Sequence, residues 1–388
     1  MGPLKGIKIV EFAGLGPAPF CAMLLSDLGA EIIKIDRQKP ISGRFDHDPR
    51  SQILNRGRRS IAVDLKNPDG QAAVFRLIDQ ADALIEGYRP GVMERLGFSP
   101  DICMERNPRL VYGRMTGWGQ DGPLVAAPGH DINYIALTGT LHAIGRKDGP
   151  PTPPLNLVGD FGGGAYLAMG LLAAILEVNG SGLEAKGSGK GQIVDAAMVD
   201  AAASMMAYFF GFSASGYWNE ERGSNYLDSG SPFYDTYETK DGKWIAIGSV
   251  EAKFWEQTWR LLDLDLEDMQ SQHDRENWQE TKEMVAEAVR QKTRDEWTEI
   301  FDGQEACVAP VLSLSEVPGH PHIVARQTIV NAGGINQPAP APRFSRTKAE
   351  LGKLPPARGE HSEEILCDWG FDTDEIAKLK DCGAVMQA

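Results

Sequence analysis

The sequence predicts an α/β protein with a Rossmann-like large domain and a smaller α+β domain. The first observation is that strand-like and helical segments alternate between residues 7 and 115, which favours a parallel sheet. The second is a change near Ser231, where a hairpin with an Asp-Gly turn is followed by acidic helical segments up to Phe301. The third is the length of 388 residues, which allows two domains.

The alternating segments of the large domain can be placed one by one. A turn at Gly14-Leu15-Gly16-Pro17 separates the first strand from the first helix, and Gly29 ends that helix. The small, apolar segment 162–176 predicts a packed helix, 180–191 a loop, and 192–206 a strand-to-helix step. The predicted early strands are 7–12, 31–36, 60–65, 83–86 and 110–115, and the early helices are 20–28 and 68–80.

The second half of the chain predicts the smaller domain and a return to the large one. Strands at 233–239 and 243–248 form the hairpin, 337–342 is an extended connector, and helices at 362–369 and 373–379 follow. The uncharged stretch 201–218 indicates a buried core helix or a helix at a subunit interface, not a membrane span. We assign 1–225 and 329–388 to the large domain and 226–328 to the small domain.

The composition limits the kinds of binding partner and the cellular compartment that we expect. The formal charge of −15 argues against general nucleic-acid binding, so an anionic ligand requires a local basic cluster. Five cysteines without close pairs predict reduced thiols and no metal site. No signal pattern precedes the first strand and no targeting sequence ends the chain, so we expect a cytoplasmic protein without membrane insertion.

Several familiar motifs are incomplete or absent in this sequence. Gly14-Leu15-Gly16 lacks the third glycine of a dinucleotide fingerprint, and the segment 187–191 lacks the hydroxyl residue and first glycine of a P-loop. No nucleophile elbow or HExxH zinc motif occurs. His320 and His322 have no patterned acidic or Cys partner, which is typical of an ordinary loop.

A basic run stands out on this acidic chain. It consists of Arg56, Arg58 and Arg59, and Arg37, Arg89 and Arg95 follow other predicted strands. Loops after parallel strands converge at the carboxyl edge of a sheet, where arginines can hold phosphates by forked hydrogen bonds. The run 56–59 is equally compatible with a surface segment that pairs with carboxylates.

Two further segments bear residues suited to proton transfer. The first is Gly129-His130-Asp131-Ile132-Asn133-Tyr134, and the second is the glycine-rich segment 158–164, which contains Asp160. Both lie at expected starts of helices. The alternatives are that Asp160 is a helix cap and that His130 is a structural group.

With these segments, the chain resembles the α-methylacyl-CoA racemases of the family III CoA-transferase superfamily. The resemblance covers nearly the whole length, and Gly-His-Asp-Ile-Asn-Tyr is its most specific motif. It implies two-domain protomers that interlock as rings in a homodimer, with each active site between the large domain of one chain and the small domain of the other. Coenzyme A is then part of the acyl-CoA substrate, and no separate cofactor is expected.

The resemblance also implies roles for single residues. His130 and Asp160 match the two acid/base groups on opposite sides of the α-carbon, and Asp131 and Glu251 match the carboxylates that orient the His and relay protons. Leu15 and Gly16 match the turn near the thioester. The residues that match the coenzyme-binding part are Arg37, Val63, Asp64, Leu65, Lys66, Gly87, Arg89, Arg95, Gly129, Asn133 and Tyr134.

One departure from the family lies beside Glu251. The family often has Ile-Glu-Pro-Gln-Phe where this chain has Val-Glu-Ala-Lys-Phe at 250–254. The positive charge of Lys253 either changes the proton affinity of Glu251 or faces solvent.

The expected chemistry requires both proton carriers. Removing the α-proton of a 2-methylacyl-CoA thioester places negative charge on its oxygen, and inversion needs a proton donor on the opposite face. Asp160 therefore needs a raised pKa, and backbone N–H groups near Asp131 are candidates to hold the oxyanion. The main alternative is a CoA-transferase with Asp160 as nucleophile. A third reading is a CoA-binding protein without catalysis.

Overall fold

The computed structural model describes residues 2–39, 48–180, 186–269 and 271–388. They fall into two compact units: unit 1 contains Met1–Ile135, Leu155–Ser204 and Pro321–Ala388, and unit 2 contains Ala136–Pro154 and Met205–His320. The small-domain boundaries inferred from the sequence, 226–328, stay a prediction. Part of the expected loop 180–191 lies outside the described residues.

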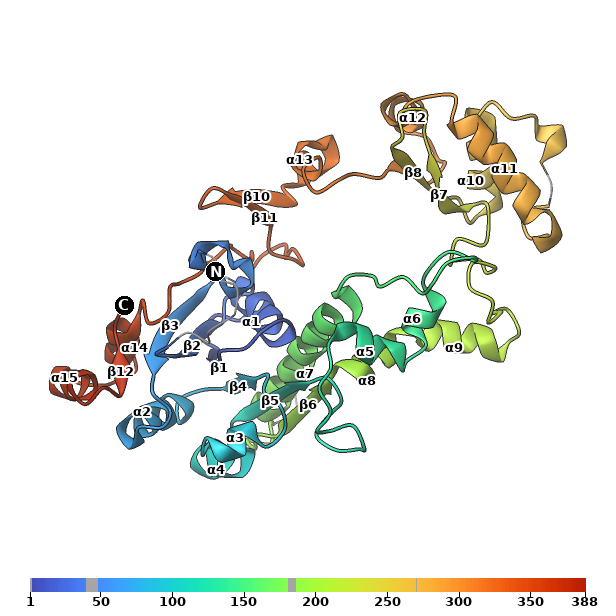
Figure 1. Ribbon diagram of the computed structural model, residues 1–388. Coiled ribbons are helices and arrows are strands. Elements are labelled where there is room, and N and C mark those ends of the chain that lie inside the picture. Colours follow the sequence, from blue (N-terminus) through green and yellow to red (C-terminus); the bar gives the residue numbers. More distant parts are fainter. Residues whose placement is uncertain (1, 40–47, 181–185, 270) are drawn as a thin grey trace. The chain divides into compact units, whose positions relative to one another are not determined.

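Unit 1 is built on a seven-stranded sheet with the strand order β12-β3-β2-β1-β4-β5-β6 (Figure 1). The six strands β1 to β6 are parallel, which confirms the predicted α/β fold, and β12 pairs antiparallel with β3 at one edge. The strands of this unit are β1 (Lys8–Phe12), β2 (Glu31–Arg37), β3 (Arg58–Val63), β4 (Ala83–Glu86), β5 (Val111–Thr116), β6 (Ile193–Ala197), β12 (Val385–Met386) and a separate hairpin of β10 (Ile329–Ala332) and β11 (Ile335–Pro338).

The helices of unit 1 cover both faces of the sheet. They are α1 (Pro17–Asp27), η1 (Pro49–Ser51), η2 (Ile53–Asn55), α2 (Pro68–Ile78), α3 (Val92–Arg95), α4 (Pro100–Arg106), α5 (Asp131–Ala136), η3 (Leu157–Phe161), α7 (Gly162–Asn179), α8 (Met198–Met205), α13 (Pro321–Arg326), α14 (Ser362–Asp368) and α15 (Thr373–Asp381). Side chains alternate along each strand, so Val10 and Ile33 join a core with α2, α14 and α15, whereas Ile9 and Ile32 join a core with α1 and α7.

The segment Leu157–Asn179 is long and apolar enough to cross a membrane by length and composition. Its Leu167 and Leu171 are buried in the core that contains α1, and α7 contacts β5 and β6. This packing is that of a core helix in a folded domain. The uncharged stretch 201–218 instead contains two short helices, α8 and α9 (Ala207–Ala214), and α9 has no buried residue.

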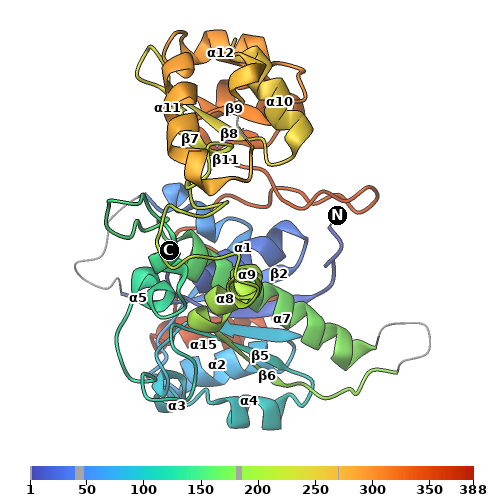
Figure 2. The ribbon, with the colours of Figure 1, turned by 90° about the vertical axis from the view of Figure 1, so that its right-hand side faces the viewer.

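Unit 2 is an α+β unit with its own core. Its elements are α6 (Thr140–Ala143), α9, β7 (Tyr234–Glu238), β8 (Trp244–Gly248), α10 (Ala252–Leu261), η4 (Leu266–Asp268), η5 (Arg275–Asn277), α11 (Trp278–Val289), α12 (Arg294–Phe301), β9 (Val308–Pro310) and η6 (Val317–Gly319). The predicted hairpin is the β7–β8 pair, with Gly242 at φ 71°, and β9 extends it to three antiparallel strands (Figure 2). The core is rich in aromatic side chains, among them Trp255, Trp259 and Trp297.

Candidate active site

The strand order of unit 1 locates the edge where a ligand is expected. The order reverses between β1 and β4, and ligands of such sheets bind beyond the carboxyl ends of the strands at this point. Residues 13–16 follow β1, and Gly87 follows β4. A Cβ on Gly87 would lie 3.0 Å from the Cβ of Ala18 in α1, so these two turns pack closely.

The basic residues expected to hold phosphates lie at this edge. Arg37 ends β2, Lys66 follows β3, and Arg89 follows β4, with Arg95 at the end of the short helix α3. All four side chains are exposed, and no ion pair engages them among the residues that the structure describes. Burial raises the pKa of Tyr88, and a hydrogen bond with Arg37 opposes that shift. The cationic groups are therefore available to an anion.

The turn after β3 brings the other predicted coenzyme-binding residues to the same edge. Val63 is buried, and the backbone N–H of Asp64 donates to the carbonyl of Ala384 at 2.9 Å. The Asp64 carboxylate accepts from the backbone N–H of Lys66 at 2.9 Å, and Leu65 packs against the core. These contacts fix the backbone that carries the Lys66 side chain.

The basic run 56–59 has a structural role. Arg56 forms a fork with Asp27, with an Nε–Oδ1 distance of 3.1 Å, and Arg58 Nε lies 3.0 Å from Glu11 Oε2. The side chains of Arg58 and Glu11 are both 0% exposed. The carboxylate partners of Arg59 are Glu31, Glu364 and Asp368. Of the two readings of this run, the pairing with carboxylates is confirmed, but the expected surface position is wrong for Arg56 and Arg58, which are buried.

His130 directly precedes α5, and its neighbours shape the turn around it. The backbone N–H of His130 donates to Asn133 Oδ1 at 3.0 Å, and its carbonyl accepts from the Asn133 N–H at 2.8 Å. The Tyr134 hydroxyl donates to the carbonyl of Gly129, and its ring packs edge-on against Trp118. Asn133 and Tyr134 thus hold the segment that presents the exposed His130 side chain.

Asp160 lies in η3, the π-helical turn that precedes α7. Asn156 Nδ2 donates to Asp160 Oδ2 at 3.0 Å, and the backbone N–H of Asp160 donates to Asp131 Oδ2 at 2.8 Å. Burial raises the pKa of Asp160 above 3.8, and Asp131 adds to the rise, while Asn156 and His130 oppose it. The structure therefore brings His130, Asp131 and Asp160 together from two separate segments.

Two glycines permit the close approach of these segments. Gly16 has φ 64°, and a Cβ there would lie 3.1 Å from Asp160 Oδ2. A Cβ on Gly159 would lie 2.6 Å from Asp131 Oδ2. The turn with Leu15, which is 61% exposed, is therefore beside the Asp160 carboxyl group.

Glu251 belongs to unit 2, so its predicted pairing with His130 stays a prediction. It is the N-cap residue of α10, is exposed, and makes no side-chain capping bond. No hydrogen bond or ion pair engages its carboxylate within the described ranges. The ammonium group of Lys253 lies 4.4 Å from the centre of the Phe254 ring.

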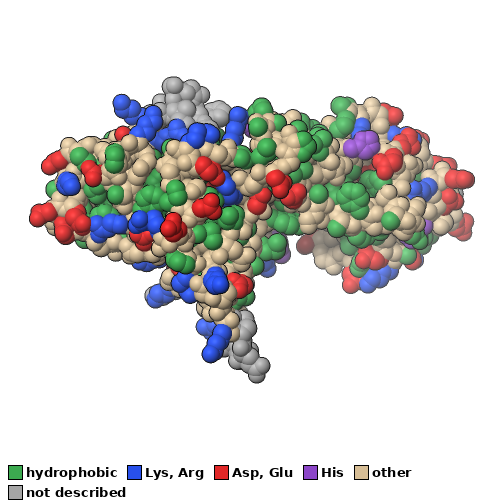
Figure 3. All heavy atoms as spheres, turned by 90° about the horizontal axis from the view of Figure 1, so that it is seen from below, with side chains coloured by type: hydrophobic (Ala, Val, Ile, Leu, Met, Phe, Trp, Pro, Cys, Tyr) green, Lys and Arg blue, Asp and Glu red, His purple; other side chains and the backbone are tan. Residues whose placement is uncertain are grey.

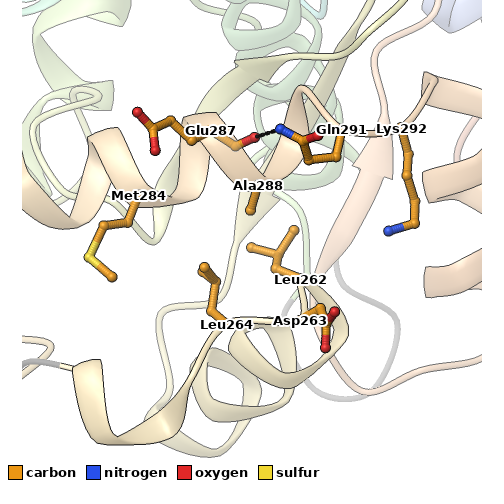
Figure 4. A pocket seen from close by; sticks show the side chains of 8 residues that line it. All are labelled: Leu262, Asp263, Leu264, Met284, Glu287, Ala288, Gln291 and Lys292. Atoms are coloured by element: carbon orange, nitrogen blue, oxygen red, sulfur yellow. Dashed lines mark hydrogen bonds between the residues drawn. The ribbon is translucent and has the colours of Figure 1, made fainter.

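Two surface hollows in unit 2 contain none of the predicted site residues. One has a volume of about 350 Å³ between the end of α10 and the helix α11 (Figure 4). It is lined by Leu262, Asp263, Leu264, Met284, Glu287, Ala288, Gln291 and Lys292. The other lies beside β9 and α12 and includes His320. The groups suited to proton transfer are instead at the sheet edge of unit 1.

Comparisons with known proteins identify the family. The model of CoA-transferase family III matches residues 4–362. The chain belongs to CoA-transferase family III. It is 40% identical over 379 residues to the α-methylacyl-CoA racemase of Mus musculus and 41% identical to that of Homo sapiens, in each case over 97% of this chain and 96% of the relative. A CAIB/BAIF family crystal structure from Brucella suis superposes with a TM-score of 0.81 at 24% identity, covering 95% of this chain and all of that one, which supports the fold.

The site of this family III protein has the parts of a proton-transfer centre. Asp160 is a carboxyl group with a raised pKa, and His130 is an exposed imidazole close enough to affect that pKa. Among the described residues, the backbone N–H of Asp131 at the start of α5 has no hydrogen-bond acceptor. An unsatisfied N–H at a helix start suits an anionic oxygen.

The sequence did not single out Asn156 or Trp118. Asn156 lies four residues before Asp160, and this spacing on a helical turn is the signal that could have revealed their contact. Trp118 packs on Tyr134, and its indole Nε1 is buried without a hydrogen-bond partner among the described residues. Nothing in the local sequence indicates that contact, because 16 residues separate the two rings.

Proposed function

We propose that this protein racemises the α-carbon of 2-methylacyl-CoA thioesters. The observation that carries the proposal is that His130 lies close enough to Asp160 to affect its pKa, and that Asp160 is a half-buried carboxyl group whose pKa is raised. A group that must alternate between acid and base near neutral pH needs such a shift. The extent of identity with the two racemases supports the same activity.

The two residues act on opposite faces of the α-carbon. In one direction neutral His130 accepts the α-proton, an enolate forms, and protonated Asp160 donates a proton to the other face. In the reverse direction Asp160 accepts and the His130 imidazolium donates. The backbone N–H of Asp131 stabilises the enolate oxygen, and the carboxylates of Asp131 and Glu251 orient the imidazole.

Coenzyme A enters as part of the substrate, and the proton transfer requires no resident cofactor. Its phosphates are held by Arg37, Lys66, Arg89 and Arg95, whose exposed side chains have no carboxylate partners among the described residues. The acyl group lies near Leu15 and Gly16. Free Cys307, Cys367 and Cys382 on the surface suit a reducing cytoplasmic compartment.

The working unit of the proposal is an interlocked homodimer, in which the partner subunit's Glu251 completes the site. Exposed apolar side chains on unit 1 include Met169 at 59% and Leu176 at 55% on α7, and Ile193 at 46% on β6. Helix α9 of unit 2 exposes Tyr208 and Phe210 at 59% and 62%. Figure 3 shows hydrophobic side chains exposed among charged ones on one face. The proposal places the exposed apolar side chains of α7, β6 and α9 in the subunit interface, where they would be covered.

Isotope exchange tests the proposal directly. Each epimer of a 2-methylacyl-CoA is incubated with the protein in deuterated water, and NMR follows the α-proton and the epimer ratio. We expect loss of the α-proton and approach to an equal mixture from either epimer, and loss of both processes in Asp160→Asn. Full racemisation by that variant would refute the two-base assignment.

CoA transfer is the alternative, because the family model includes that activity in its name. It requires Asp160 as a nucleophile that forms a mixed anhydride with the acyl group and releases CoA thiolate. Mass spectrometry after incubation with acyl-CoA and a carboxylate acceptor distinguishes the two. A covalent adduct on Asp160 without α-proton exchange would favour the transferase.

A further inference from the structure

Among the described residues of unit 2, no hydrogen bond or ion pair fixes the direction of the Glu251 carboxylate. Its backbone carbonyl accepts from the N–H groups of Phe254 and Trp255, each at 3.0 Å, which is the first hydrogen bonding of α10. Its side chain makes no bond to the helix N-terminus. The direction of the carboxylate therefore depends on how firmly the backbone just before α10 is held.

Contacts with Gln272, Ala306 and Thr258 hold that backbone from other parts of unit 2. Gln272 Nε2 donates to two successive carbonyls, Ser249 O at 3.0 Å and Val250 O at 2.8 Å. The buried Ser249 hydroxyl donates to the carbonyl of Ala306, and it lies 2.8 Å from the hydroxyl of Thr258. The two peptide groups that precede Glu251 are thus anchored from both sides.

The segment that supplies Gln272 is itself fixed. The carbonyl of Gln272 accepts from the indole N–H of Trp278 at 2.9 Å, and Trp278 is buried in the core of unit 2. The neighbouring His273 packs against Tyr226 and Phe233. A rigid support of this kind is expected behind a group that must be held in a productive geometry.

We propose that Gln272 is a positioning residue for Glu251. The side-chain amide of Gln272 fixes the peptide groups of Ser249 and Val250, and through them it affects the rate of proton transfer. This inference rests on the proposed function, in which Glu251 orients His130. Gln272 does not touch the substrate. Without the Gln272 amide, the Glu251 carboxylate is held less firmly in position. Small misplacement of a group near the reacting atoms slows a reaction without weakening substrate binding.

The test compares Gln272→Met, which keeps the length but removes the amide, with Gln272→Glu, which keeps an oxygen but cannot donate. With 2-methylacyl-CoA as substrate, we expect kcat for α-proton exchange to fall by roughly ten- to a hundredfold in both, with KM unchanged. In the Glu251→Gln background, Gln272→Met should cause no further loss, because the group that it positions is already gone.

The matched control is Gln291→Met. Gln291 follows α11, and its Nε2 also donates to a backbone carbonyl of unit 2, that of Glu287 in α11. The Gln291→Met variant should retain the parent kcat. Unchanged kcat in both Gln272 variants, additive losses with Glu251→Gln, or a Glu251→Gln variant that loses nothing would each overturn the inference. Absence of exchange in the parent protein would refute the proposed function instead.

Discussion

The pKa of Asp160 is set by burial and by opposing contacts with single residues. Burial and the charge of Asp131 favour the neutral carboxyl, whereas the amide of Asn156 and the imidazole of His130 favour the carboxylate. Asn156 supplies the largest opposing contribution and does so through one hydrogen bond of 3.0 Å. The working pH range of the proposed reaction is therefore sensitive to this one side chain.

Replacing Asn156 with Leu should raise the pKa of Asp160, because a donor to the charged form is lost. When Asp160 is the base, the ascending limb of kcat/KM against pH moves to higher pH. When it is the acid, the descending limb also moves to higher pH. Rate profiles measured from each epimer check both shifts, with Asn331→Leu as control, since Asn331 bonds Asn336 in the β10–β11 hairpin. A shift of either limb to lower pH would contradict the assignment.

Because the pKa of Asp160 is raised, its ionised form should lower the free energy of unfolding. A group whose folded-state pKa lies above its unfolded value of 3.8 contributes stability below that pH and loses it as the pH rises through the folded-state value. Asp160→Asn removes the titration, so its Tm should exceed that of the parent at about pH 8, and the difference should be smaller at about pH 3.8, where the carboxyl group of the folded protein is mostly protonated. Thermal unfolding at the two pH values measures this. An equal difference at both would show that charge is not the cause.

Sequence reasoning singled out the proposed proton carriers but not the residues that support them. His130 and Asp160 belong to recognisable motifs, whereas the fork of Arg56 joins it to Asp27, 29 residues away, and Arg59 reaches Asp368, 309 residues away. No local pattern distinguishes an arginine with such a distant carboxylate from one that is free for a phosphate. The two readings of the run 56–59 stayed open for this reason.

At the scale of elements, the pattern of apolar residues was enough to place β1 to β5 and the helices α1, α2 and α7, because each buried strand is short and bounded by turn residues. Helices α3 and α4 were missed. The edge strand β12 was missed. It has two residues, and its pairing of Val385 with Val63 depends on the rest of the sheet being formed. For helix α5, the sequence predicted only that a helix starts near Asp131. A helix of six residues is too short to show a helical repeat of apolar residues.

The two kinds of arginine in these elements should respond differently to the same change. Arg58→Met leaves Glu11 buried without a cation and should cost about 3–5 kcal/mol of unfolding free energy. Arg95→Met removes an exposed cation and should change stability by less than about 0.5 kcal/mol. It should raise KM for the acyl-CoA and weaken the dependence of KM on salt. Urea unfolding and steady-state kinetics measure both effects. An unchanged KM in Arg95→Met would remove it from the phosphate site.

At the scale of the whole molecule, the catalytic groups of the proposal are divided between two compact units. His130 and Asp160 belong to unit 1, and Glu251 belongs to unit 2. Helix α9 is apolar without a single buried residue, which a chain working alone would be expected to avoid. The proposed site therefore needs both units, and the exposed apolar surface of α9 suits the proposed assembly of two chains.

Paired variants test that assembly. Asp160→Asn and Glu251→Gln should each be impaired alone. If each site combines unit 1 of one chain with unit 2 of its partner, a mixed dimer has one intact site, so equal co-expression should restore about a quarter of the parent activity. A site within one chain would give no recovery, because every chain carries a defect. Interlocked chains cannot exchange after folding, so mixing the two purified variants should restore nothing until they are unfolded and refolded together. Recovery on simple mixing would refute interlocking while keeping the shared site.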